Sequence, residues 1–141
     1  MEIKNVMTDN VSSVDPNATV NEAAQIMKNL NVGAVPVCEG NKPVGIITDR
    51  DITIRNIATG GNANAAVQDS MTEDLVYGEP TMTTEEAAQL MAKHQVRRLP
   101  IVENGELIGI VSLGDLAVEG KTDMEASEAL TEISVPSQPQ K

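Results

Sequence analysis

The clearest pattern in the sequence is a pair of helical stretches, each introduced by a threonine and a glutamate three residues apart. Thr19-x-x-Glu22 and Thr83-x-x-Glu86 have the form of a capping box, in which the hydroxyl and the carboxylate satisfy N–H groups left free at a helix start. Small and apolar residues then recur at helical spacing; they are Val20, Ala23, Ala24, Met27 and Leu30 in the first stretch and Ala87, Ala88 and Met91 in the second. We therefore expect a helix after each motif.

Short runs of β-branched and apolar residues follow each predicted helix and predict a hairpin there. The expected strands are Ala34–Cys38, Val44–Thr48, Leu99–Glu103 and Leu107–Ser112. Asn104-Gly105, between the last two strands, is a strong signal for a two-residue hairpin loop. A second helix is expected over about Arg50–Ala58, with a shorter counterpart after the last strand.

The two halves are copies of one another. When the sequence is shifted by 64 positions, residues 7–52 align with 71–116 without a gap, and 15 of the 46 pairs are identical, where average residue usage predicts roughly 3. A duplication explains this agreement. We expect a first copy at residues 1–59, a linker at 60–66 (GGNANAA), a second copy at 67–120, and a tail at 121–141 that is partly helical, around Met124–Ile133, or disordered. A copy of about 60 residues is marginal alone, so the two are expected to pack together.

The second strand of each hairpin ends in a motif that can carry chemistry: GIITDRD (45–51) and GIVSLGD (109–115). In both motifs a hydroxyl residue stands three positions before an aspartate. The pairs are Thr48 with Asp51 and Ser112 with Asp115. One interpretation is a further capping box. The other is a nucleotide site, in which the helix start attracts phosphate and the carboxylate accepts ribose hydroxyls. The glycine opening each motif leaves room for a ligand or a neighbouring strand. The two interpretations are compatible.

The tandem arrangement of these motifs, each with a strand centred on Pro36 or Pro100, resembles the paired cystathionine-β-synthase (CBS) domains of small stand-alone bacterial proteins, over about residues 1–120. The resemblance implies an α+β fold of two βαββα repeats with pseudo-two-fold symmetry. It implies clefts between the copies that bind AMP, ADP or ATP, or S-adenosylmethionine or NAD(H). Asp51 and Asp115 would bind ribose, with Thr48 and Ser112 near ribose and phosphate, and adenine would meet the backbone at Val35, Pro36, Leu99 and Pro100. Stand-alone members commonly form homodimers.

The arginines point to the same regions, because the chain has only four and all lie beside these motifs: Arg50, Arg55, Arg97 and Arg98. Guanidinium groups suit phosphate, to which they bind with two hydrogen bonds. Arg50 and Arg55 could instead pair with acids on an exposed helix face. Arg97-Arg98 replaces Gly33-Ala34 of the first copy, so the second copy is the better candidate for a phosphorylated ligand.

Composition excludes several function classes. The net charge of −11 opposes binding to nucleic acid or anionic lipid, and no apolar run is long enough to span a membrane. One Cys (Cys38) and one His (His94) do not make a metal site by themselves; we expect a buried cysteine and a histidine at a helix end. No nucleophile with a base and no lysine-containing phosphate loop is visible, so an enzyme is not expected. A cytoplasmic protein is expected.

Two functions remain after these exclusions. The first is a sensor that binds an adenosine derivative and thereby regulates a protein partner, which the sequence does not identify. The second is a constitutive dimeric scaffold without a small-molecule ligand, in which Thr48, Asp51, Ser112 and Asp115 only cap helices.

Overall fold

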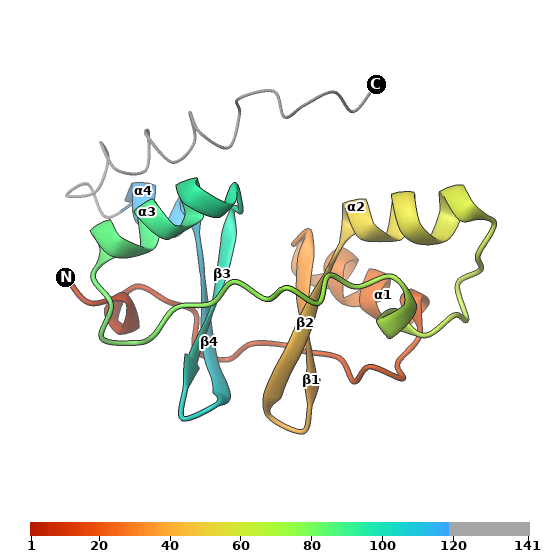
Figure 1. Cartoon of the computed structure of the whole chain (residues 1–141), viewed down its shortest axis with the longest axis horizontal. Coiled ribbons are helices and arrows are strands. Elements are labelled where there is room, and N and C mark those ends of the chain that lie inside the picture. The colour runs from red at the N-terminus through yellow and green to blue at the C-terminus, as the bar shows by residue number, and fades with distance from the viewer. Residues whose placement is uncertain (119–141) are drawn as a thin grey trace. The chain divides into compact units, whose positions relative to one another are not determined.

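The chain folds as a mixture of short helices and two-stranded antiparallel sheets, which confirms the α+β class (Figure 1). The structure is a computed structural model and describes residues 1–118; the predicted helix at Met124–Ile133 lies outside these residues. The helices with α geometry are α1 (Val20–Leu30), α2 (Asp49–Asp51), α3 (Thr84–His94) and α4 (Leu113–Val118). The strands are β1 (Ala34–Glu39), β2 (Lys42–Thr48), β3 (Arg98–Glu103) and β4 (Glu106–Ser112).

The two long helices begin where the threonine motifs predict. Thr19 Oγ1 accepts a hydrogen bond from Glu22 N at 3.1 Å, and Thr83 Oγ1 accepts one from Glu86 N at the same distance. Glu86 Oε1 also accepts from Thr83 N at 3.1 Å, which completes the reciprocal box in the second copy. In the first copy the capping box is only half formed: Thr19 Oγ1 accepts from Glu22 N, but the Glu22 side chain accepts no hydrogen bond from Thr19 N.

The second helix of the first copy is helical over residues 49–59 but changes geometry along its length. After α2 comes a stretch of π-helix, η2 (Ile52–Asn56), and then a 3-10 turn, η3 (Ile57–Thr59). The chain then turns at Gly60, where φ is +83°. The expected helix is therefore present, with wider and then tighter turns than an α-helix.

Each hairpin pairs as its strands predict. β1 runs antiparallel to β2, with a bulge between Val37 and Cys38. β3 pairs with β4 through a loop in which Asn104 and Gly105 have φ values of +55° and +79°. Two consecutive positive φ angles are what the favoured two-residue hairpin turn requires, so this predicted turn is confirmed.

A third and a fourth chain segment extend each hairpin through single bridges. Val14 pairs with Val37 in parallel, and Gly78 pairs with Ile101 in the same way. The strand that precedes the helix in the expected βαββα repeat is therefore present in each copy only as a single bridge. On the other edge, Thr72 pairs with Ile46 of β2, and Thr8 pairs with Ile110 of β4. We call Met7-Thr8 and Met71-Thr72 the entry segments. Each entry segment bonds to the hairpin of the other copy.

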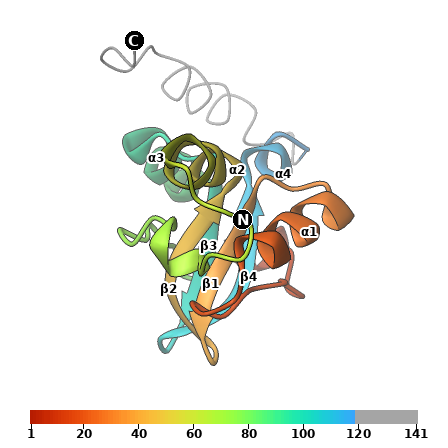
Figure 2. The ribbon, with the colours of Figure 1, turned by 90° about the vertical axis from the view of Figure 1, so that its right-hand side faces the viewer.

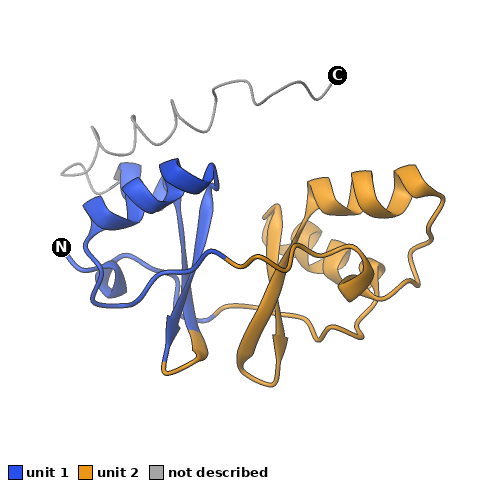
Figure 3. Cartoon of the chain, viewed as in Figure 1, with its two compact units in different colours: residues 1–10, 76–103, 108–141 blue, residues 11–75, 104–107 orange. Residues whose placement is uncertain are grey.

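The exchange of entry segments defines two compact units that differ from the sequence repeats (Figure 3). Unit 1 contains residues 1–10, 76–103 and those from 108 on, and unit 2 contains residues 11–75 and 104–107. In unit 2, α1 lies beside β1 (Figure 2), and its core consists of Val14, Ala23, Met27, Val35, Val37, Ile47 and Val67. The linker predicted at 60–66 leads into a packed segment, since Val67 is fully buried and Thr19 bridges to Ala66.

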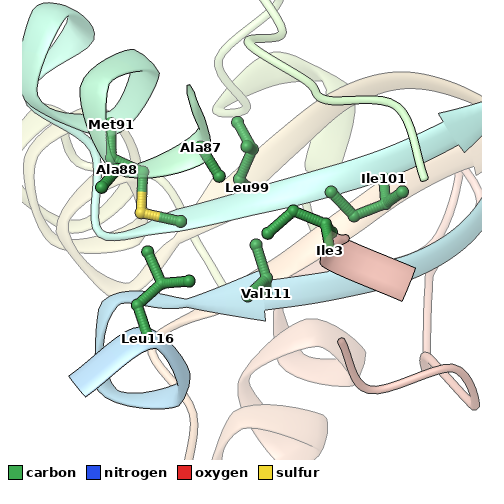
Figure 4. Close-up of a cluster of buried hydrophobic side chains, with 8 residues drawn as sticks. All are labelled: Ile3, Ala87, Ala88, Met91, Leu99, Ile101, Val111 and Leu116. Carbon is green, nitrogen blue, oxygen red and sulfur yellow. The ribbon is translucent and has the colours of Figure 1, made fainter. Parts of the chain in front are cut away.

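The core of unit 1 includes a residue from the first copy of the repeat. Ile3 is fully buried among side chains of the second copy, with Leu99, Ile101 and Val111 close by (Figure 4). Its backbone N–H donates to Met82 O at 2.8 Å. Ile3 is therefore part of the hydrophobic core of unit 1.

We expect Ile3→Ala to lower the free energy of unfolding by about 2–4 kcal/mol, because it removes buried methyl groups and leaves a cavity. Urea unfolding followed by circular dichroism measures the loss. Lys4→Ala is the matched control, because the Lys4 side chain is 53% exposed and its ion pair with Glu2 is at the surface. Equal stabilities of the two variants would contradict the placement of Ile3 in this core.

Candidate functional site

Both aspartates singled out from the sequence lie where a hairpin ends and a helix begins, and both complete a capping box. Asp51 N donates to Thr48 Oγ1, and Thr48 N donates to Asp51 Oδ2, each at 3.0 Å. The second copy repeats this, with Asp115 N to Ser112 Oγ at 3.1 Å and Ser112 N to Asp115 Oδ2 at 2.8 Å. The capping interpretation is confirmed at both junctions, and it fixes each carboxylate in one orientation.

The first-copy carboxylate is surrounded by protein groups. Asp51 is only 8% exposed. The Thr72 hydroxyl lies 3.3 Å from each of its oxygens, and Arg55 Nε lies 3.8 Å from Oδ1. Arg55 also donates from Nη1 to Met71 O at 2.9 Å. Thr48, Asp51 and Arg55 are thus brought together around an entry segment.

The second-copy carboxylate is more open. Asp115 is half-buried, and among residues 1–118 its carboxylate has one hydrogen-bond donor, Ser112 N. Thr8, the counterpart of Thr72, is exposed and meets β4 through its backbone. Asp115 Oδ1 therefore keeps its capacity to accept hydrogen bonds within the part of the chain that the structure describes.

The second-copy arginines lie next to this junction. Leu113 N, at the start of α4, donates to Arg97 O at 2.9 Å, which ties the Arg97 backbone to the Ser112–Asp115 turn. Arg97 is exposed and Arg98 is half-buried, and neither makes an ion pair with a described residue. In the first copy Gly33 takes the place of Arg97 and accepts from Asp49 N. Arg50 is exposed and its N–H donates to Asp49 Oδ1.

The residues predicted to meet adenine lie within the hairpins. Val35 and Leu99 are buried in the two cores and are only 1% and 0% exposed, backbone included, so a ligand could reach them only if neighbouring groups moved. The carbonyls of Pro36 and Pro100 accept hydrogen bonds from Val14 N and Gly78 N.

The glycine that opens each motif is required by an entry segment. A Cβ at Gly45 would lie 2.7 Å from Thr72 O, and one at Gly109 would lie 3.0 Å from Thr8 O and against the Met7 sulfur. Of the two uses that the sequence suggested for these glycines, the approach of a neighbouring strand is the one seen. Thr72 occupies the position equivalent to Thr8 in the repeat, and its contact with Asp51 joins residues 21 positions apart, for which the local sequence carries no signal.

The single cysteine and the single histidine lie where the sequence predicts them. Cys38 is buried, and this burial raises the pKa of its thiol. A hydrogen bond with Ser13 acts in the opposite direction but is the smaller effect, so the pKa remains raised. His94 is the last residue of α3, as expected. Residues 1–118 hold no group of three or more His, Cys, Asp or Glu side chains suited to a metal ion. No helix in this described part is long and apolar enough to cross a membrane.

We expect Gly45→Ala to lower the free energy of unfolding by about 1–3 kcal/mol, because the added methyl group meets the rigid backbone of Thr72. Chemical denaturation measures the change. Gly114→Ala is the control: its new methyl group would have no closer neighbour than Ser112 Oγ at 3.6 Å, and alanine favours a helix. A Gly45→Ala protein as stable as the Gly114→Ala protein would contradict the close approach.

Comparison with known protein families gives a match to each half of the chain. The model of the CBS domain matches residues 3–55 and again residues 66–120. The CBS domain-containing protein YhcV of Bacillus subtilis (strain 168) is 50% identical over 132 residues, which cover 94% of this chain and 94% of that protein.

Solved structures with the same fold include two with bound groups. A crystal structure of Hypoxic Response Protein I with two coordinated zinc ions has a TM-score of 0.78 and 32% identity, and the match covers 84% of this chain and 98% of that one. A crystal structure of CBSX2 in complex with AMP has a TM-score of 0.75 and 26% identity, and the match covers 88% and 98%.

Proposed function

Because the chain belongs to the CBS domain family and carries two copies of the domain, we propose that it is a regulatory module that binds an adenine nucleotide, AMP, ADP or ATP. Proteins with paired CBS domains are generally regulatory modules. The fold shared with a protein solved with AMP supports the choice of an adenine nucleotide. S-adenosylmethionine and NAD(H) contain the same adenosine group and belong in the same test.

The observation that carries the proposal is the Asp115 junction. The Asp115 carboxylate is oriented by its cap, and no residue among 1–118 donates a hydrogen bond to its Oδ1. It can therefore accept hydrogen bonds from the two hydroxyls of a ribose. Ser112 lies beside it and the backbone of Arg97 is bonded to the same turn. We propose ribose at Asp115, phosphate near Ser112, Arg97 and Arg98, and adenine at the backbone of Leu99 and Pro100.

Charge supports a phosphorylated ligand at this place. The chain carries a net charge of −11, which disfavours the approach of an anion to most of its surface. Arg97 and Arg98 are adjacent cations without a carboxylate partner among residues 1–118. Guanidinium groups in this state can bind phosphate without first breaking an ion pair.

Regulation requires the nucleotide to prefer one state of the protein over another, because a ligand shifts an equilibrium only by its difference in affinity for the two states. At a concentration 100 times its Kd, a nucleotide that binds only one state stabilises that state by about 2.7 kcal/mol. A change of this size is sufficient to alter a surface that contacts a partner protein.

We expect AMP, ADP or ATP to raise the melting temperature by about 5 °C or more at saturating concentration. Differential scanning fluorimetry with these nucleotides, S-adenosylmethionine and NADH measures the effect. Asp115→Ala removes the ribose acceptor and should abolish the shift. Asp74→Ala is the control, because it makes the same change in charge at an exposed position.

Two results would contradict the proposal. An unchanged shift in Asp115→Ala would mean that the ligand binds elsewhere. No shift with any compound in the panel would favour the second candidate function, a dimeric scaffold without a ligand. The observation that favours the scaffold is that Asp51 and Asp115 both complete capping boxes, so each has a structural role without any ligand.

We also propose that the protein forms a homodimer. Ile54 and Ile57 are 50% and 60% exposed on the helical stretch 49–59, where they would be covered by a second copy. Light scattering coupled to size-exclusion chromatography should give twice the chain mass of 15.0 kDa. Ile54→Asp should shift the protein toward the monomer, and a mass of one chain for the parent would contradict the proposal.

A further inference from the structure

Asp51 joins three parts of unit 2. Its Oδ2 accepts from Thr48 N at the end of β2, and both of its oxygens lie 3.3 Å from the hydroxyl of Thr72 in the entry segment. Arg55, on the helical stretch 49–59, approaches Oδ1 with its Nε and donates from Nη1 to Met71 O. Asp51 is 8% exposed as a residue and its side chain is 10% exposed, so these groups largely replace water around the carboxylate.

The entry segment is therefore held by side chains as well as by its backbone bridge. The bridge consists of Ile46 N to Thr72 O at 3.0 Å and Thr72 N to Ile46 O at 2.8 Å. Beyond Thr72 the chain runs through Leu75, where the continuous stretch 11–75 of unit 2 ends, into Val76 of unit 1. Asp51 thus holds Thr72 close to the point where the chain passes from this stretch to unit 1.

The second copy has the same backbone arrangement without the side-chain contacts. Thr8 N donates to Ile110 O and Ile110 N to Thr8 O, both at 2.9 Å. The Thr8 hydroxyl makes no hydrogen bond with a described residue, and no arginine of residues 1–118 pairs with Asp115. The difference between the copies lies in the side chains around two carboxylates that are capped alike.

We propose that Asp51, Thr72 and Arg55 form a latch that fastens the entry segment Met71-Thr72 to the first copy, and that nucleotide binding is therefore confined to Asp115. The second part rests on the function proposed above. A ribose at Asp51 would have to displace the Thr72 hydroxyl from a buried carboxylate, whereas a ribose at Asp115 displaces no described protein group. The loss of a hydrogen bond to a charged group weakens binding by about tenfold or more. The chain accordingly takes up one nucleotide.

The latch itself is tested without a ligand by comparing Thr72→Val with Thr8→Val. Both variants replace a hydroxyl with a methyl group at equivalent positions and keep the backbone bridge. Thr72→Val should lower the melting temperature by about 3–6 °C, because it removes a donor to a buried carboxylate, and Thr8→Val should leave it nearly unchanged. Equal effects of the two substitutions would overturn the latch.

The confinement of binding is tested by isothermal titration of the full chain with AMP. The parent protein should bind one AMP per chain. Asp115→Asn should weaken binding by about tenfold or more, whereas Asp51→Asn should retain the affinity of the parent and melt at a lower temperature. Circular dichroism establishes that each variant is folded.

The outcomes separate the latch from the proposed function. Two equivalent AMP sites per chain, or loss of binding in a folded Asp51→Asn protein, would overturn the confinement to Asp115. No binding of AMP to the parent protein would count against the proposed function and against confinement, while the comparison of Thr72→Val with Thr8→Val would still decide whether the latch exists. If Asp51→Asn does not fold, the parent protein decides the confinement: one AMP per chain supports it, and two equivalent AMP molecules overturn it. A second AMP that binds only to Thr72→Val would support the latch as the cause of the confinement.

Discussion

Close backbone contact at two glycines is the constraint on which the rest of the structure depends. Gly45 and Gly109 have no side chain, and the entry segment of the opposite copy occupies that space and bonds to the neighbouring residue of the strand. This contact gives each hairpin a further paired edge and brings Thr72 to Asp51.

Duplication has produced two junctions with the same backbone and different chemistry. The caps Thr48–Asp51 and Ser112–Asp115 contain the same two hydrogen bonds, with distances between 2.8 and 3.1 Å. The side chains around them differ, since Asp51 faces Thr72 and Arg55 whereas the Ser112–Asp115 turn is bonded to the backbone of Arg97. Both carboxylates cap a helix, and they differ in the other groups that surround them among the described residues.

Features governed by neighbouring residues could be predicted from the sequence. The turn at Asn104-Gly105 and the caps at Thr83 and Asp115 depend on residues within three or four positions, and they are present. Contacts between distant segments could not be predicted in this way. Nothing near Ile3 indicates that it lies in the core of the second copy, and the pairing of Thr72 with Asp51 requires the exchange of entry segments to be known.

The burial of Ile3 also has a consequence for the order in which the protein can fold during its synthesis. Unit 2 is built mainly from the continuous stretch 11–75, so nearly all of its residues leave the ribosome together. Unit 1 joins residues 1–10 to residues from Val76 onward, and it closes only after the second hairpin has been translated. Because domains generally fold as units while the chain emerges, the Ile3 side chain stays uncovered until residues as far along the chain as Val111 and Leu116 have been synthesised.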